Sequence, residues 1–160
     1  MSGEIHVTPI GVDAAELALV NIGQAVKGQQ LVQALSRLGV RQTKRRIESE
    51  KTSPDGARWA PTRQGRGALF VRGRHLAASI RGAATGNKAI WGTGWIGARV
   101  HQFGAIIVPV QAKALVFEIG GRKVFAQKVV IPARPYIGVS QANAEEIMDT
   151  TQKFLARFLK

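Results

Sequence analysis

The sequence predicts an α+β fold: an antiparallel sheet with N-terminal helices and a C-terminal helix packed on it, plus an extended hairpin. Three observations support this: helical apolar periodicity in the first third, β-rich segments separated by glycine turns in the middle, and a second helical periodicity at the end. The chain has 160 residues, 45% of them hydrophobic, which is enough for one domain with its own core. We therefore expect a single domain over residues 1–160.

The N-terminal third predicts two helices separated by Gly28. The second, over residues 29–50, repeats leucine on one face, as a helix that packs on a core does (Leu31, Leu35 and Leu38). Gly39 lies inside this helix, where glycine costs roughly 1 kcal/mol relative to alanine. The sequence thus allows a kink or a break at Gly39.

A stripe of cations follows the other face of the second helix. Its members recur at helical spacing: Arg37, Arg41, Lys44 and Arg45. Acidic residues come only at the end of the helix, at Glu48 and Glu50, so the stripe is barely neutralised. Two interpretations stay open: the stripe is an ordinary solvated face, or it faces DNA or an acidic neighbouring subunit.

Residues 52–68 predict a flexible basic loop. Residues 53–56 (SPDG) are a turn signature, because proline fixes φ and glycine tolerates an unusual backbone conformation. Trp59, Arg63 and Arg66 follow, with the two arginines beside glycines. An aromatic side chain in such a loop either stacks on nucleic-acid bases or anchors the loop to the core.

The middle of the chain predicts two hairpins. The first pairs residues 81–85 with residues 87–93. The second pairs residues 115–119 with residues 122–131 about a two-glycine turn. This second hairpin either extends from the body and pairs with an adjacent protomer, or it is an ordinary part of one closed sheet.

Between the hairpins, residues 91–104 predict a strand end, a glycine turn and a short helix. The apolar residues of that helix share one face, namely Ile96, Val100 and Phe103. Gly104 is placed just past the end of the helix, and His101 and Gln102 lie in its last turn.

The C-terminal part predicts a rigid segment followed by a helix. Two prolines flank the Ala-Arg pair that contains Arg134 and hold it away from helical geometry, and Tyr136 is expected to bury. Ser140 or Asn143 caps the final helix. The helix is expected to pack across the sheet against the N-terminal helices through one apolar face (Ile147, Thr151, Phe154, Leu155 and Phe158).

Several classes of function lack their sequence signals. The chain has no cysteine, its three histidines lack metal-ligand spacing, and no apolar run reaches the roughly 18 residues that a membrane span needs. No nucleophile elbow or phosphate-binding Walker loop is present, and the GTGWIG segment lacks the acidic residue of a dinucleotide site. We therefore predict no catalytic residue, metal or cofactor, and we predict that the protein is not an enzyme.

Four blocks, in this order along the chain, resemble the Mu-like phage virion morphogenesis family. They are RRIESEKTSPDGARWAP at residues 45–61, GRHLAASI at 73–80, IGARVHQFG at 96–104 and IPARPYIGVS at 131–140. The resemblance spans residues 12–160. It implies a tail completion protein that terminates the tail, joins it to the head and forms a homo-oligomeric ring, which the resemblance further implies to be a hexamer. Candidate residues for the subunit or partner interface are Trp59, His101, Gln102, Phe103, Arg134 and Tyr136.

The resemblance also implies partners and a location. The partners are other copies of the chain, the phage tail tube and the head connector proteins, and the location is the head-tail junction of the virion after assembly in the bacterial cytoplasm. Membranes are not expected partners.

The charge of the chain adds a third class of partner. With 23 basic and 10 acidic residues, the net charge is +13, which attracts polyanions such as genomic DNA. Candidate DNA- or acid-facing residues are Arg37, Arg41, Lys44, Arg45, Arg63 and Arg66. Two alternatives stay open: a sequence-independent DNA-binding protein that uses residues 37–46 and 58–74, and a joining protein on the head side of the neck.

Overall fold

The computed structural model describes residues 12–27, 29–62, 69 and 75–158. Its helices are α1 (Val12–Lys27), α2 (Gln30–Arg45), the π-helix η1 (Arg46–Glu50), α3 (His75–Ser79), α4 (Ala98–Phe103), α5 (Gln141–Leu155) and the 3-10 helix η2 (Ala156–Phe158). Its strands are β1 (Ile80–Thr85), β2 (Lys88–Thr93), β3 (Ala105–Ile107), β4 (Leu115–Ile119), β5 (Arg122–Ala126) and β6 (Val129–Ile131).

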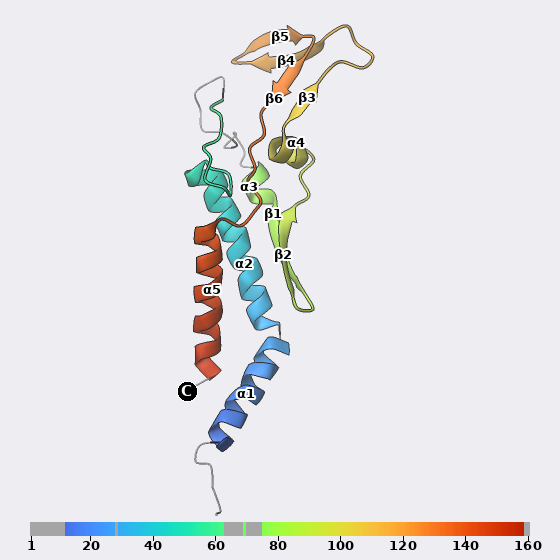
Figure 1. The fold of residues 1–160 in the computed structure, drawn as a ribbon. Coiled ribbons are helices and arrows are strands. Elements are labelled where there is room, and N and C mark those ends of the chain that lie inside the picture. Colours follow the sequence, from blue (N-terminus) through green and yellow to red (C-terminus); the bar gives the residue numbers. More distant parts are fainter. Residues whose placement is uncertain (1–11, 28, 63–68, 70–74, 159–160) are drawn as a thin grey trace, which may run out of the picture.

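Helix α2 forms the axis of an elongated molecule (Figure 1). Helix α5 lies antiparallel to it on one side, and the β1–β2 hairpin lies along its other side. Helix α1 continues beyond the N-terminal end of α2, whereas strands β3 to β6 lie at the opposite end of the molecule, beyond α4. We call residues 105–131, which contain these four strands, the β arm.

The α+β class predicted from the sequence is confirmed, but the described strands do not form one sheet. They form three separate two-stranded antiparallel sheets, β1–β2, β3–β6 and β4–β5. The predicted strand over residues 122–131 is divided, because its second part, β6, leaves β5 and pairs with β3. Helix α5 consequently packs on α2 rather than across a sheet.

The core is small and lies where α2 and η1 meet α3 and α4. Its buried side chains are Ile47, Trp59, Leu69, Leu76, Ala77, Ile80, Ala98 and Tyr136. Val40, Trp95 and Ile137 pack around them. Each contributing element is short, so the core depends on contacts between segments that are distant in the sequence.

Gly39 has a packing role. Helix α2 runs without a break through Gly39, so the kink that the sequence allowed is absent. A Cβ atom at Gly39 would lie 2.4 Å from the Trp91 ring, and one at Gly82 would lie 2.4 Å from the Ser36 hydroxyl. The two glycines therefore let α2 and the β1–β2 hairpin approach closely, and Ser36 Oγ donates to the carbonyl of Ile90 at 2.9 Å.

The predicted helix after Trp91 forms, but it begins later than expected. Helix α4 starts at Ala98, so Ile96 lies outside it and is 96% exposed. Phe103, at its end, is 72% exposed. Two of the three predicted apolar residues thus point to solvent, whereas Val100 is half-buried. Gly104 has φ 74°, as expected for the residue that ends a helix.

Helix α5 is capped as the sequence predicts. Ser140 and Asn143 form a capping box, in which each side chain bonds to the backbone N–H of the other residue. The predicted apolar side is half-buried against α2 and α1, from Ile147 to Phe158. Within the described ranges, no helix combines the length and apolar character that a bilayer crossing requires.

Two glycine substitutions separate packing from helix propensity. We expect Gly39→Ala to lower the free energy of unfolding by about 1–3 kcal/mol, because the new methyl group overlaps the Trp91 ring. Gly23→Ala, in α1, meets no atom within 4 Å and should raise it by up to about 1 kcal/mol. Urea unfolding of the full chain measures both, and stabilisation by both substitutions would contradict the packing role of Gly39.

Candidate functional site

The segment between the β arm and α5, residues 132–140, lacks regular secondary structure and is held almost entirely by side chains from elsewhere in the chain. It connects β6 to the first turn of α5. Its attachment therefore decides where the arm sits relative to the two long helices. We call residues 132–140 the connecting segment.

Gln102 binds the backbone of the connecting segment through both ends of its side-chain amide. Its Oε1 accepts from the amides of Tyr136 and Ile137 at 3.0 and 3.1 Å, and its Nε2 donates to the Ile137 carbonyl at 3.1 Å. The amide of Arg134 donates to the carbonyl of His101 at 2.8 Å. A Cβ at Gly104 would lie 2.9 Å from the backbone nitrogen of Ala133, so the end of α4 and the segment meet at a position that requires glycine.

Arg134 and Trp59 join the connecting segment to the loop after η1. Arg134 is 6% exposed, and its Nε and Nη2 donate to the Ala60 carbonyl at 3.1 and 3.0 Å. Burial lowers the pKa of Arg134, and among the described residues no carboxylate pairs with it. Trp59 Nε1 donates to the Pro135 carbonyl at 3.2 Å, which confirms the interpretation of Trp59 as an anchor.

Arg46 holds the other end of the connecting segment. Its side chain is 1% exposed, and Nη1 donates to the carbonyls of Tyr136 and Gly138 at 3.3 and 2.8 Å. Nη2 donates to Asn143 Oδ1, the same atom that accepts from the Ser140 amide in the α5 cap. Desolvation lowers the pKa of Arg46, and the Glu50 carboxylate at 3.9 Å opposes that effect.

An aromatic pair lies beside these contacts. The rings of Trp95 and His101 stack with centroids 5.5 Å apart and an interplanar angle of 6°. They line a small apolar cavity of about 160 Å³ with Leu69, His75 and Leu76. His101 Nδ1 is buried and has no hydrogen-bond partner among the described residues. Burial, and then the nearby charge of Arg134, lower the pKa of His101.

The structure brings the six predicted interface residues into one region around α4 and the connecting segment. Trp59, Arg134 and Tyr136 are buried inside the chain, where the Tyr136 hydroxyl donates to the Ala98 carbonyl at 3.2 Å. His101 and Gln102 are half-buried, and Phe103 is exposed. Contact of these residues with another subunit stays a prediction. Phe103 is the member whose ring is most available for it.

The predicted cationic stripe is divided by the tertiary structure. Arg37 and Arg41 are exposed, and Lys44 is half-buried. Arg45 Nε donates to Glu50 at 2.7 Å and its Nη2 donates to Glu146 at 3.2 Å, so this end is neutralised, contrary to the prediction from the local sequence. Arg63 and Arg66 lie outside the described residues, as does the glycine-rich end of the predicted basic loop.

Glu146 shows how the neutral end of the stripe is arranged. Hydrogen bonds from Gln42 Nε2 at 2.9 Å and from Arg45 lower the pKa of Glu146. Gln42 Nε2 also donates to the Asn143 carbonyl at 3.1 Å. The first turn of α5 is therefore bonded to α2 through three polar side chains.

Three residues that the sequence did not single out come into functional positions in the structure. Arg46 begins η1 directly after α2, seven residues after the buried Gly39 and three after the buried Thr43, and this spacing was the available signal. Lys153 of α5 and Arg157 of η2 line a groove together with Arg37 of α2, and local sequence gave no signal for that arrangement. Among the described residues, no three His, Asp or Glu side chains gather in a way that could hold a metal ion.

Removal of the Arg46 guanidinium should destabilise the fold. We expect Arg46→Met to lower the free energy of unfolding by roughly 3 kcal/mol, since it removes the hydrogen bonds to the carbonyls of Tyr136 and Gly138 and to the Asn143 side chain. The control, Arg41→Met, removes an exposed arginine from the same helix and should change stability by less than about 0.5 kcal/mol. Equal losses in urea unfolding would contradict the role of Arg46.

His101 should make stability depend on pH below neutrality. Because its pKa is lower in the folded chain, the unfolded chain binds more protons below about pH 6.5, and stability should fall as pH falls from there to the folded pKa. His101→Phe can keep a ring against Trp95 and should reduce the loss between about pH 7.5 and 5.5. Urea unfolding at both pH values measures this loss of stability, and an unchanged loss in the variant would refute the assignment of the pH dependence to His101.

Comparison with known proteins identifies a family. The sequence model of the phage virion morphogenesis family matches residues 12–156, which include α1, the connecting segment and α5. Neither the search of curated proteins nor the search of solved structures gives a significant match. A match of this extent assigns the protein a structural role in phage assembly and a virion-associated location. The chain therefore belongs to the phage virion morphogenesis family.

Proposed function

We propose that this protein completes the phage tail and joins it to the head by assembling into a closed ring of identical subunits, a hexamer, at the head-tail junction. The family assignment supports a structural role in the virion. A position at the tail is what the resemblance of the four sequence blocks implies. The proposal adds the mode of assembly, which is argued from the surface of the β arm.

The β arm carries the observation on which the proposal rests. Its exposed apolar side chains are Ile106, Ile107, Val108, Val110, Val116, Phe125 and Val130, and Val110 is 94% exposed. Ile106 pairs across its sheet with Val130, and Val116 pairs with Phe125, so exposed apolar side chains lie next to each other on both sheets. Neighbouring exposed apolar side chains of this kind often mark a protein interface. The arm thus resembles half of an interface whose other half is supplied by a second protein.

The backbone of the arm supports the same conclusion. Both of its sheets have only two strands, β3–β6 and β4–β5, and a two-stranded sheet alone in water is marginally stable. Each such sheet has unpaired edges, to which a strand of another chain can add. A neighbouring copy presents the same edges, so strand addition between copies would complete the arm.

Ring formation also requires two different contact surfaces on each subunit. A head-to-tail contact is heterologous, and it closes into a ring when the rotation between copies allows it. The second apolar surface is on α1, where Leu17, Leu19 and Val20 are 62%, 68% and 49% exposed. It lies at the opposite end of the molecule from the arm (Figure 1). Each subunit thus presents two different apolar surfaces, as a head-to-tail contact between copies requires.

Two other functions remain as alternatives to tail completion. A joining protein on the head side of the neck would use the same surfaces, and a sequence-independent DNA-binding protein would use the +13 charge. The exposed apolar arm favours protein assembly over DNA binding alone. We propose no catalytic group or cofactor, because assembly of this kind requires none.

The experiment supplies the protein from a plasmid to phage that lack it and examines the particles by electron microscopy. Without the protein we expect filled heads and separate, unjoined or overlong tails. Joined, infectious particles in its absence would overturn the proposal. Complete tails that are not attached to closed heads would favour the head-side joining protein instead.

A matched pair of variants tests the role of the arm in the same assay. Ile106→Asp places a charge on the arm, whereas Ile90→Asp places one on β2, and the two side chains are 64% and 51% exposed. We expect Ile106→Asp to give unjoined tails and Ile90→Asp to support joining. Melting curves of the purified variants check that both remain folded, and joined particles with folded Ile106→Asp would contradict the assembly role of the arm.

A further inference from the structure

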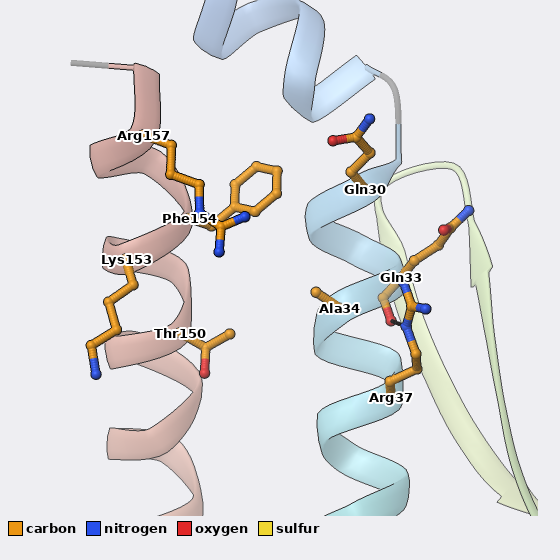
Figure 2. Close-up of a pocket in the computed structure, with 8 residues that line it drawn as sticks. All are labelled: Gln30, Gln33, Ala34, Arg37, Thr150, Lys153, Phe154 and Arg157. Carbon is orange, nitrogen blue, oxygen red and sulfur yellow. Dashed lines mark hydrogen bonds between the residues drawn. The ribbon is translucent and has the colours of Figure 1, made fainter. Parts of the chain in front are cut away.

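A groove between α2 and α5 gathers positive charge at the end of the molecule nearest α1. It has a volume of about 460 Å³, and its polar and aromatic lining includes Gln30, Gln33 and Arg37 from α2, Lys153 and Phe154 from α5, and Arg157 from η2. Figure 2 shows Phe154 of α5 and Arg157 of η2 pointing toward α2, while Arg37 runs along α2 beside Gln33. We call this the α2–α5 groove.

The groove has three cations and no carboxylate in its lining. Lys153 Nζ donates to Asp149 Oδ2 at 2.8 Å. Arg37 uses Nε to donate to the Gln33 carbonyl at 3.4 Å, which leaves its terminal nitrogens available. Among the described residues, no ion pair involves Arg37 or Arg157. Two guanidinium groups of like charge thus line one groove without an acidic partner from the described part of the chain.

The contrast with the other end of the same helix pair is informative. There Arg45 meets both Glu50 and Glu146, and Gln42 adds a hydrogen bond to Glu146. The pairing of α2 with α5 therefore neutralises one end and leaves the other positive. The positive end adds Arg157 and Lys153, which come from a part of the chain more than a hundred residues away from Arg37.

We propose that the α2–α5 groove binds phosphate groups of the DNA backbone. Guanidinium groups bind phosphates through paired N–H donors, and the amides of Gln30 and Gln33 and the hydroxyl of Thr150 add neutral donors beside them. Contacts of this kind carry no sequence preference. The net charge of +13 increases the attraction of the whole chain to a polyanion.

The lining of the groove includes few apolar side chains, and this favours DNA over an acidic protein. Phe154 is its one aromatic side chain, and Ala34 is a small neighbour. A peptide helix bound in a groove needs apolar anchors at successive turns, for which this lining has few counterparts. A phosphate backbone requires cations and hydrogen-bond donors, which the groove supplies. The inference rests on the proposed function only for the source of the DNA, the genome that passes the head-tail joint.

The test measures binding of the full chain to a fluorescein-labelled duplex of mixed sequence by anisotropy, between roughly 50 and 200 mM salt. The groove variant is Arg37→Gln with Arg157→Gln. The control is Arg58→Gln with Arg122→Gln, which removes two exposed arginines outside the groove and changes the net charge by the same amount.

We expect the groove variant to lose at least about tenfold in affinity and to lower the slope of log affinity against log salt by about 2, one for each phosphate contact. The control should lose less than about threefold. Equal losses in both variants would show that the charge acts diffusely and would overturn the proposal. A groove variant that loses affinity for polyglutamate but not for the duplex would overturn it in favour of an acidic protein partner.

The assays distinguish failure of the proposed DNA binding by the groove from failure of the proposed function in tail completion. The groove variant is also supplied to phage that lack the protein, and joining is scored by electron microscopy. If the groove variant gives joined particles and binds the duplex with unchanged affinity, the DNA-binding role of the groove is contradicted and the proposed function is not. If the wild-type chain and the control bind DNA as expected but particles without any protein are joined and infectious, the proposed function fails and the groove stands.

Discussion

The buried guanidinium of Arg46 is the interaction on which the rest of the structure depends. It binds two carbonyls of the connecting segment and the side chain of Asn143, which caps α5. One side chain therefore joins the end of α2, the segment that leaves the β arm and the start of the last helix. Burial of a charge is costly unless hydrogen bonds compensate, so these acceptors and the guanidinium require one another.

The same logic extends through Arg134 and Gln102. Each satisfies backbone groups of an irregular segment that has no strand or helix partner of its own. The apolar core is small, and polar side chains from η1 and α4 fix much of the position of the connecting segment. Within the described residues, the arm beyond it has no comparable set of side-chain hydrogen bonds to the body, which agrees with an element that is completed by another molecule.

The charges of the chain follow from the antiparallel pairing of α2 with α5. Glu146 faces Arg45 at one end, and Arg157 faces the Arg37 side at the other. A stripe that is continuous in the sequence becomes neutral in one half and more positive in the other. The α2–α5 pair is therefore neutralised at its end near the β arm and stays positive at its end near α1.

The sequence by itself determined the α+β class, both helices of the N-terminal third, the two glycine-turn hairpins, the cap of α5 and the burial of Tyr136. These features depend on periodicity, turn chemistry and capping within a few residues, which local sequence records. Only the tertiary structure decided that the strands stay in three pairs, that Trp59 is buried as an anchor, that Gly39 packs against Trp91, and that Arg46 is buried while Arg37 and Arg157 line one groove. These outcomes depend on which distant segments come into contact, and the spacing of neighbouring residues does not determine the energy of such contacts.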